Sequence, residues 1–299
     1  MISSTDLQLV QAIARGGSLA AASRTLNVTA SAVSQRLSSL EQRLGLKLAE
    51  RSGGASLVMT TEGELLAARA EQLLNTLDGL EEEIAAQRGI ISGHLKVIAP
   101  LGFGRLRIAP LLATFQTQNQ GITVNLQLSD QLGHLPRDSW DIIFRVGPLK
   151  NSDLLRTTIA SNRRILCASP DYLKQHGSPR TPADLTNHQC IAIREDDEDV
   201  TLWRFTGKEG KRSDIRIAPP LASNDGEVAK GWALSDRGII LRSEWSVRED
   251  IKAGRLTELL PHWQAPDAPV TALTHHNSTK PARVQLFLDF AKERLGKTV

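Results

Sequence analysis

Cysteine, aromatic residues and long apolar runs are scarce in this chain of 299 residues. Two cysteines cannot form a disulfide framework, so a reducing cytoplasm is the expected compartment. Aromatic residues are only 4% of the chain, which disfavours the stacking platforms that bind single-stranded nucleic acid. No apolar run approaches the ~18 residues of a membrane span. The first residues carry Asp6 but no basic segment, so no signal peptide is expected.

Sequence motifs of common enzymes and metal sites are also missing. The chain has no His-Glu-x-x-His, no Gly-x-Ser-x-Gly and no Walker A sequence. Its histidines are scattered, and the adjacent His275 and His276 would face opposite sides of a strand. Cys167 and Cys190 lie in apolar segments typical of buried strands. We therefore expect no catalytic residue, no metal site and no cofactor.

The formal net charge of +3 conceals three segments of different charge. Residues 1–60 carry six basic and three acidic side chains, a net charge of +3. Residues 61–90 carry two basic and seven acidic side chains, a net charge of −5. The remaining 28 basic and 23 acidic side chains give residues 91–299 a net charge of +5. Shifts of this kind mark boundaries between segments.

The first segment predicts three short helices. Apolar residues recur at helical spacing over residues 7–14, and Gly16 with Gly17 ends that helix. Ser18 and Thr29 are suitable N-caps for two further helices joined by a short turn. This is a helix-turn-helix pattern, in which the start of the last helix enters the major groove. A plain three-helix packing unit with a solvated polar face shows the same pattern, so both interpretations stay open at this point.

The acidic segment predicts one long helix. Thr61 and Glu64 have capping-box spacing. The apolar residues that follow recur at alternating intervals of four and three, as in a heptad seam; they are Leu66, Ala70, Leu73, Leu77, Leu80 and Ile84. We interpret the seam as a dimer contact, because the other faces are strongly charged; packing on its own domain is the alternative.

From residue 94 onward, short apolar segments alternate with helical ones. Strands are expected at 94–99, 122–128, 141–145, 164–168, 190–193 and 238–241. Helices are expected at 106–118, 170–176, 227–235 and 282–295. The alternation predicts α/β units with parallel sheets. Ligands bind to such sheets outside the carboxyl ends of the strands, where helix N-termini offer free N–H groups.

An ordered set of small, polar and apolar residues lies between Asp6 and Leu66. It consists of Ser18-Leu19-Ala20-Ala21-Ala22, Leu26, Val28, Ser31-Ala32-Val33-Ser34, Leu40-Glu41, Leu44-Gly45, Leu48, Arg51 and Thr60-Thr61-Glu62-Gly63. By these residues the segment resembles the winged helix-turn-helix of LysR-type transcriptional regulators. The resemblance implies contacts to DNA from Thr29, Ser31, Ser34, Gln35 and Arg36 of the recognition helix and from Arg51 of the wing.

Two departures from the family pattern fall in the wing. The family has Leu-Phe-x-Arg where this chain has Leu48-Ala49-Glu50-Arg51. The following residues, 52–56, carry no cation, whereas the family's wing is basic. Fewer phosphate contacts and a shallower salt dependence of DNA binding are therefore expected.

Further matching segments extend the resemblance over essentially the whole chain. They are Gly93–Val97, Asp141–Gly147, Cys167–Leu173, Thr181–Leu185, Ser223–Asp225 and Pro281–Phe290. They imply a two-lobed α/β effector domain like that of periplasmic binding proteins. The implied domains are 1–60 (winged helix-turn-helix), 61–91 (linker and dimerisation helix) and 92–299 (effector domain, with lobe I at 92–161 and 268–299 and lobe II at 162–267). Residues 88–93 would form the hinge.

The resemblance places an effector between the two lobes. The implied effector-binding residues are Pro100, Leu101, Gly102, Phe103, Ser129, Arg145, Gly147, Ser169, Asn224 and Asp225. Arg145 would be the counter-charge for an organic acid, or else a structural ion pair within the first lobe. The first turn lacks the family's hydroxyl, and Asn224 with Asp225 could equally cap the next helix. Some family members sense oxidants through a cysteine pair, so a thiol switch at Cys167 and Cys190 stays open.

Two functions follow from these patterns. The first is a cytoplasmic transcriptional regulator that binds a pseudo-palindromic operator in double-stranded DNA as a homodimer or homotetramer. A small-molecule effector would shift its population between lobe arrangements and so change how it contacts or bends DNA. The alternative is a cytoplasmic solute-binding protein or enzyme with an N-terminal oligomerisation domain. The missing catalytic motifs and signal peptide favour the regulator, with no role for a membrane.

Overall fold

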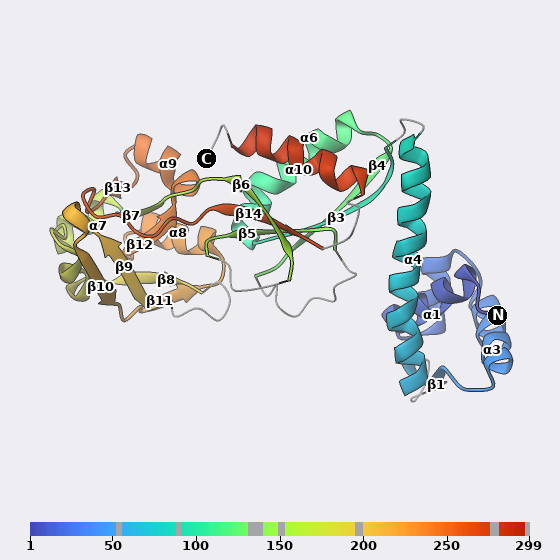
Figure 1. Cartoon of the computed structure of the whole chain (residues 1–299). Coiled ribbons are helices and arrows are strands. Elements are labelled where there is room, and N and C mark those ends of the chain that lie inside the picture. The colour runs from blue at the N-terminus through green and yellow to red at the C-terminus, as the bar shows by residue number, and fades with distance from the viewer. Residues whose placement is uncertain are drawn as a thin grey trace. The chain divides into compact units, whose positions relative to one another are not determined.

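The computed structural model describes residues 1–51, 56–87, 91–130, 140–148, 153–194, 200–275 and 281–296. The chain forms two compact units, Met1–Gly89 and Ile90–Val299 (Figure 1). The tip of the expected wing, 52–55, and the first part of the expected hinge, 88–90, lie outside the described residues. No helix in the described part of the chain is both long enough and apolar enough to cross a membrane.

The first unit contains four helices and a two-stranded wing. Its elements are α1 (Ser4–Gly16), α2 (Leu19–Leu26), α3 (Ala30–Leu44), β1 (Ala49–Arg51), β2 (Leu57–Met59) and α4 (Thr61–Gln87). The strands β1 and β2 pair antiparallel. Apolar residues of α1, α2 and α3 and of the wing form one core, against which Leu66 of α4 also packs. The three short helices expected from the sequence are thus confirmed.

The helix ends follow local hydrogen bonding. The Ser18 hydroxyl accepts the Ala21 N–H at the start of α2, and the Thr29 hydroxyl accepts the Ala32 N–H at the start of α3. At the start of α4 the Thr60 hydroxyl accepts the Gly63 N–H. The predicted capping box of Thr61 with Glu64 is therefore wrong, because α4 begins one residue earlier than that pairing requires.

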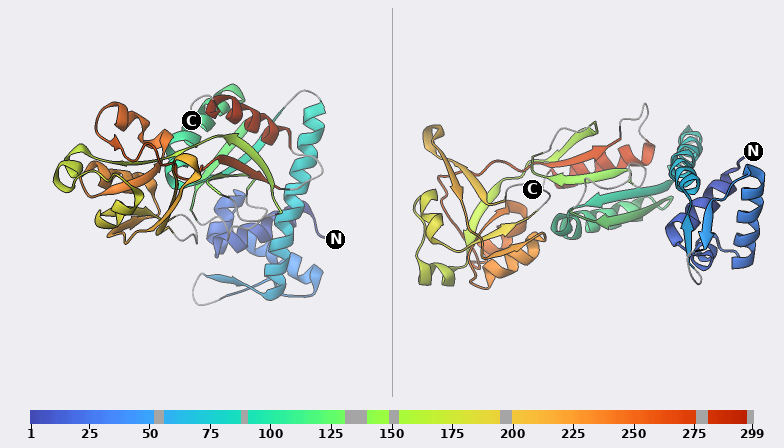
Figure 2. Two further views of the ribbon diagram at one scale, coloured as in Figure 1. Left: turned by 60° about the vertical axis from the view of Figure 1, so that its left-hand side comes forward. Right: turned by 90° about the horizontal axis from the view of Figure 1, so that it is seen from below.

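The described part of the second unit contains two five-stranded sheets, each with helices on its faces, and a two-stranded hairpin (Figure 2). The first sheet, called lobe I here, has the strand order β4-β3-β5-β14-β6. Its strands are β3 (Gly93–Ala99), β4 (Ile122–Leu128), β5 (Ile142–Val146), β6 (Leu155–Ala160) and β14 (Val270–Thr274). Its helices are α5 (Leu101–Phe103), the π-helix η1 (Gly104–Ile108), α6 (Ala109–Gln118) and α10 (Ala282–Leu295). Apolar residues of α6 and α10 share one core with β3, β5 and β14.

The second sheet, called lobe II here, has the order β11-β8-β12-β7-β13. Its strands are β7 (Arg164–Ala168), β8 (Cys190–Ile193), β11 (Leu221–Ser223), β12 (Ile239–Ser243) and β13 (Thr257–Glu258). The hairpin β9 (Leu202–Thr206) with β10 (Arg212–Arg216), α7 (Pro170–His176) and η3 (Pro182–Asn187) cover one face. The helices α8 (Gly226–Leu234) and α9 (Glu244–Lys252) cover the other. A short 3-10 turn, η4 (Lys208–Gly210), joins the two strands of the hairpin.

Both sheets are mixed, whereas the sequence predicted parallel ones. In lobe I, β14 runs antiparallel to β5 and β6; in lobe II, β7 runs antiparallel to β12 and β13. The reason is that the chain passes between the sheets twice, after β6 and before β14, so strands enter from the neighbouring lobe. Asn162 lies at the first passage, and its amide N–H group donates to the Ala268 carbonyl at the second.

Candidate DNA-binding surface and effector cavity

The polar face of α3 is exposed at the positions expected to contact DNA. Thr29, Ser31, Gln35 and Arg36 are exposed, and Ser34 is half-buried. The apolar residues of the same helix lie in the core of the first unit. Neither Gln35 nor Arg36 makes a side-chain hydrogen bond or ion pair to any described residue. A rigid helix thus presents one amide and one guanidinium that are available to base edges and phosphates.

The wing brings a second cation close to α3. Arg51 ends β1 and is exposed, with Leu57 of β2 opposite it. Arg51 and Ser34 both line a hollow of about 360 Å³ between α3 and the wing. The structure therefore brings together residues of the recognition helix and the wing arginine, as a winged helix-turn-helix requires.

Glu41 holds the start of the wing, which the sequence analysis did not anticipate. Its buried carboxylate accepts hydrogen bonds from the N–H groups of Leu48 and Ala49 and from the Lys47 ammonium, the last at 2.7 Å. Burial raises the pKa of Glu41, but the hydrogen bonds from Lys47 and the two N–H groups outweigh it and lower the pKa below its usual value. Glu41 lies in the last turn of α3, and nothing in the sequence indicated that its carboxylate is buried.

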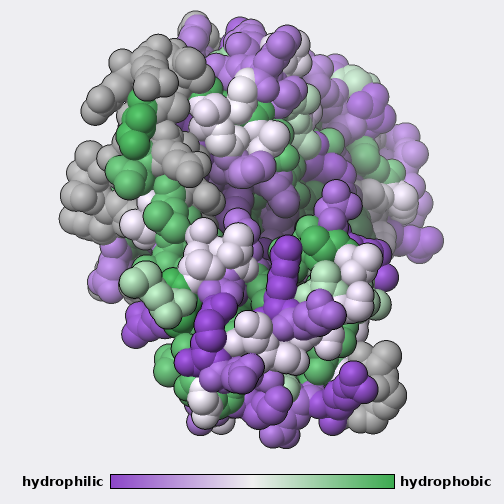
Figure 3. Space-filling view, turned by 90° about the vertical axis from the view of Figure 1, so that its right-hand side faces the viewer, coloured by the Kyte–Doolittle hydropathy of each residue, from purple (hydrophilic) through white to green (hydrophobic). Residues whose placement is uncertain are grey.

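The expected seam of α4 divides into two parts. Ala70 is fully buried in its own unit and Leu66 is half-buried there. The other four seam residues are exposed to 53% (Leu73), 44% (Leu77), 53% (Leu80) and 52% (Ile84). A column of apolar side chains is visible in the space-filling view of this side (Figure 3). The first turns of α4 thus pack on their own unit, as the alternative interpretation of the seam expected. The later turns keep an uncovered apolar face.

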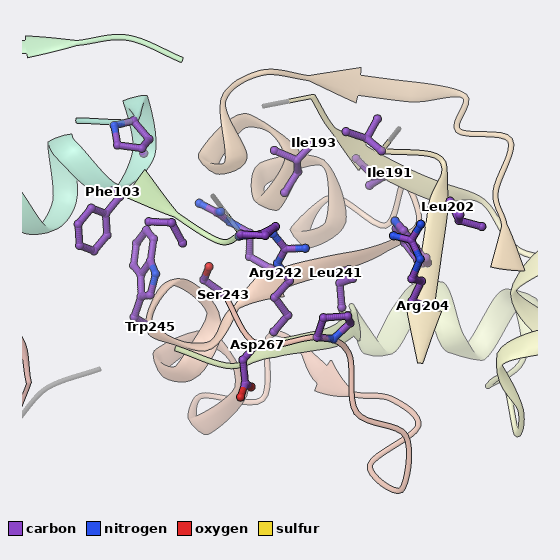
Figure 4. A pocket seen from close by; sticks show the side chains of 18 residues that line it. Phe103, Ile191, Ile193, Leu202, Arg204, Leu241, Arg242, Ser243, Trp245 and Asp267 are labelled. Carbon is purple, nitrogen blue, oxygen red and sulfur yellow. The ribbon is translucent and has the colours of Figure 1, made fainter. Parts of the chain in front are cut away.

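A cavity of about 220 Å³ lies in the second unit, between the two lobes (Figure 4). Lobe I contributes the turn after β3 and the end of β5. Lobe II contributes the starts or ends of β7, β8, β9 and β12. The full lining is Pro100, Gly102, Phe103, Val146, Pro148, Arg164, Ile191, Ile193, Val200, Leu202, Trp203, Arg204, Leu241, Arg242, Ser243, Trp245, Pro266 and Asp267.

Three of the ten expected effector-binding residues line this cavity: Pro100, Gly102 and Phe103. The other seven do not. They are Leu101, Ser129, Arg145, Gly147, Ser169, Asn224 and Asp225. Arg145 lies within the lobe I sheet opposite Thr271, and the Leu101 N–H donates to Asp130. Neither Cys167 nor Cys190 is among the residues that line the cavity.

Ser169 and Asp225 cap helices. The Ser169 hydroxyl accepts the Tyr172 N–H at the start of α7 and donates to Asp236. Asp225 accepts the Glu227 N–H at the start of α8 and forms an ion pair with Arg105 of lobe I at 2.9 Å. Burial raises the pKa of Asp225, but the hydrogen bonds from Arg105 and the Glu227 N–H lower it below the usual value.

Three contacts join the lobes beside the cavity. The Arg105–Asp225 ion pair is the first. In the second, the rings of Phe103 and Trp245 meet edge to face with centroids 5.3 Å apart. In the third, Gly102 lies so close to Arg242 that a Cβ there would be 3.2 Å from its guanidinium. The cavity therefore lies directly beside contacts that depend on the relative position of the lobes.

Arg242 is the buried centre of a charge network in lobe II. Its guanidinium donates to Glu227 at 2.8 Å and lies over the Trp245 ring at 5.3 Å. Glu227 also pairs with Lys230 at 2.7 Å. Sequence reasoning missed Arg242, Arg164 and Arg204, because each lies on a strand that is separated in sequence from the expected turns.

The two thiols lie on opposite faces of the lobe II sheet. Cys167 belongs to the core beneath α8 and α9, and Cys190 to the core beneath α7 and the hairpin. Both are free and buried, and burial raises the pKa of each to about 12. Each thiol is therefore protonated at neutral pH, and the sheet lies between the two.

A winged helix-turn-helix with an uncovered apolar linker helix, together with a two-lobed α/β unit that encloses a cavity, defines a class: DNA-binding regulators that respond to a small molecule. Comparison with known proteins then narrows the class. Residues 4–64 match the bacterial regulatory helix-turn-helix protein model of the lysR family, and residues 88–296 match the LysR substrate binding domain model.

Known transcriptional regulators are similar to this chain over nearly its whole length. The HTH-type transcriptional regulator DmlR of Escherichia coli (strain K12) is 33% identical over 96% of this chain and 93% of its own. The regulator CrgA of Neisseria meningitidis serogroup B is 30% identical over 99% and 98%. The full-length Vibrio cholerae virulence activator AphB superposes with a TM-score of 0.64 at 27% identity, covering 97% and 98%. The solved structure of CrgA from Neisseria meningitidis superposes with a TM-score of 0.63 at 29% identity, covering 99% of this chain and 100% of its own.

This chain belongs to the LysR family of transcriptional regulators. It is a DNA-binding regulator with an effector-binding domain, and the relatives named above are regulators or activators of transcription rather than enzymes. The alternative of a solute-binding protein or enzyme is therefore set aside.

Proposed function

We propose that the chain binds a pseudo-palindromic operator with α3 in the major groove. Thr29, Ser31, Ser34, Gln35 and Arg36 would contact bases and phosphates, and Arg51 would contact the flanking minor groove or backbone. The observation that carries this proposal is the exposed polar face of α3, on which Gln35 and Arg36 have no side-chain partner among the described residues. Because the target is chromosomal DNA, the proposed activity is cytoplasmic.

The proposed operator-binding species is a homodimer that pairs through α4. An apolar face with four residues about half exposed is costly in water, and a second copy of the same helix would cover it. A two-fold dimer presents two α3 helices to two half-sites. The proposed division of the chain is 1–60 for DNA binding, 61–91 for dimerisation and 92–299 for the effector; a tetramer would add a second contact.

The proposed effector is an organic acid that binds in the cavity between the lobes. The cavity offers three guanidinium groups against one carboxylate, Asp267. A ligand that contacts both lobes changes their relative populations only by its difference in affinity for the two arrangements. Such a shift would move the paired DNA-binding units and alter operator contacts.

An electrophoretic mobility shift tests the DNA-binding surface. Arg36→Ala should weaken binding to the chain's own upstream DNA about tenfold, because it removes one guanidinium from the groove. Arg212→Ala, an exposed arginine of the β9–β10 hairpin, is the matched control and should leave binding unchanged. Equal affinity of Arg36→Ala and wild type would remove α3 from the proposal.

A further inference from the structure

We propose that the cavity takes a monocarboxylate with an apolar body, and that Arg164 and Ser243 bind its carboxylate. The proposal rests on the proposed function, because it specifies the ligand of the same effector domain. It replaces Arg145, the counter-charge expected from the sequence, with a residue that lines the cavity.

The lining has more hydrogen-bond donors than acceptors. Arg164 makes no side-chain hydrogen bond or ion pair with any described residue. The Nε of Arg242 and the indole Nε1 of Trp245 are buried, and neither has an acceptor in the described part of the chain. Buried donors without partners are costly, so a ligand that fills this cavity is expected to bring acceptors.

Arg164 and Ser243 lie side by side at one end of this lining. They face each other across the antiparallel pair β7–β12, where side chains on the same face are within contact distance. The Ser243 hydroxyl accepts the Asn162 amide N–H at 3.0 Å, which leaves its own O–H free to donate. A guanidinium and a hydroxyl donor at adjacent positions are suited to the two oxygens of one carboxylate.

The charges of the lining favour a single anionic group. Arg242 is already paired with Glu227 at 2.8 Å. Arg204 pairs with Asp214 at 3.9 Å, so Arg164 is the one lining guanidinium without a side-chain partner among the described residues. Figure 4 shows Arg204 beside Leu202, across the cavity from Phe103 and Trp245, with Arg242 between them. One carboxylate can pair with Arg164, whereas a second carboxylate would find no unpaired guanidinium in this lining.

The rest of the lining is apolar. Ile191, Ile193, Leu202 and Leu241 of lobe II line the cavity, and the aromatic rings of Phe103 and Trp245 lie together at one end of it. Ser243 is the single hydroxyl among the described lining residues, and the turn after β3 supplies glycine and phenylalanine instead. A branched or aromatic acid would bury its body against these residues, whereas a small hydroxy acid has little apolar surface to bury there.

Calorimetric titration of the full chain tests the ligand class. The probes are benzoate, phenylacetate and isovalerate, each compared with its uncharged amide, together with acetate and glycolate. At least one of the three larger acids should bind with a Kd below about 1 mM, and its amide at least about tenfold more weakly. Acetate and glycolate should also be at least about tenfold weaker, because they lack the apolar body.

Substitutions in the same titration test the two residues. Arg164→Gln should weaken binding of the acid about tenfold or more and leave binding of the amide unchanged, so that the preference for charge disappears. Ser243→Ala should cost about fivefold. Arg163→Gln is the matched control, because this neighbouring arginine pairs with Glu244 and does not line the cavity. Melting curves verify that each variant is folded.

The outcomes separate this proposal from the function on which it rests. It is overturned if no larger acid binds, if an amide or glycolate binds as tightly as the acid, or if Arg164→Gln binds the acid like wild type. Operator binding is measured in the same preparations as a readout that does not depend on ligand binding. Selective operator binding without any of these affinities would refute the ligand class alone, and loss of operator binding would refute the regulator.

Discussion

At the residue scale, Glu41 does most to connect the recognition helix with the wing. It extends from α3 to the backbone N–H groups of Leu48 and Ala49, at the start of β1. Its lowered pKa means that the ionised form stabilises the folded state. That contribution is complete above the unfolded-state value of 4.5 and is lost as the pH falls through the lower folded-state value.

Glu41→Gln should loosen the wing without unfolding α3. The amide cannot hold the Lys47 ammonium as an ion pair and accepts the two N–H groups more weakly, at a cost of about 1–2 kcal/mol. Hydrogen exchange of peptides spanning residues 47–49 should be faster in the variant at neutral pH, and the difference should shrink below pH 4.5. Glu50→Gln, on the exposed side of the same strand, is the control; equal exchange in both variants would refute this role.

The cysteines yield a second prediction at this scale. Because burial raises the pKa of Cys167 and Cys190 to about 12, almost no thiolate is present at neutral pH. Iodoacetamide should therefore label neither residue in the folded chain and both in urea, as counted by mass spectrometry. Rapid labelling of the folded chain, or a disulfide after mild oxidation, would reopen the thiol switch.

At the element scale, α4 carries the proposal of a dimer. Leu77→Asp places a charge in the middle of the exposed apolar face and should convert the dimer to monomers in sedimentation velocity, with much weaker operator binding. Leu65→Asp is the matched control, because Leu65 is an exposed leucine of the same helix outside the seam. A dimer that survives Leu77→Asp, or one lost equally in both variants, would contradict pairing through this seam.

Much of the fold could be predicted from apolar periodicity and from residues that cap helices. Ser18 and Thr29 cap the helices expected of them, and the strands Ile122–Leu128, Arg164–Ala168 and Cys190–Ile193 have the predicted bounds. The strand β14, Val270–Thr274, was not predicted from the sequence, although it is buried along its whole length. Its five residues follow a proline-rich passage and return from the other lobe, so nothing local indicates their partner strands.

The effector cavity could be predicted only in part. The turn Pro100–Phe103 was found because it directly follows a strand, which is where α/β sheets bind ligands. Arg164 and Ser243 are far apart in sequence and meet only through the antiparallel pairing of β7 with β12. Since the sequence predicted parallel sheets, it could not place these residues opposite each other.

At the scale of the whole molecule, the regulation proposed above requires that the lobes have more than one arrangement. The contacts that would change are polar and aromatic: Arg105 with Asp225, and Phe103 with Trp245. Arg105 is about half exposed, so its ion pair contributes at most about 1 kcal/mol. Contacts this weak allow a ligand between the lobes to shift the population with a modest difference in affinity.

We propose that a dimer of this chain binds an operator with two half-sites. DNase footprinting of the chain's own upstream DNA tests this proposal most directly. We expect protection of two related half-sites whose centres are one or a few helical turns apart, on one face of the duplex. Leu77→Asp should lose this protection at the same protein concentration, and Leu65→Asp should keep it. Protection without sequence selectivity, or of a single half-site by wild type, would contradict the account.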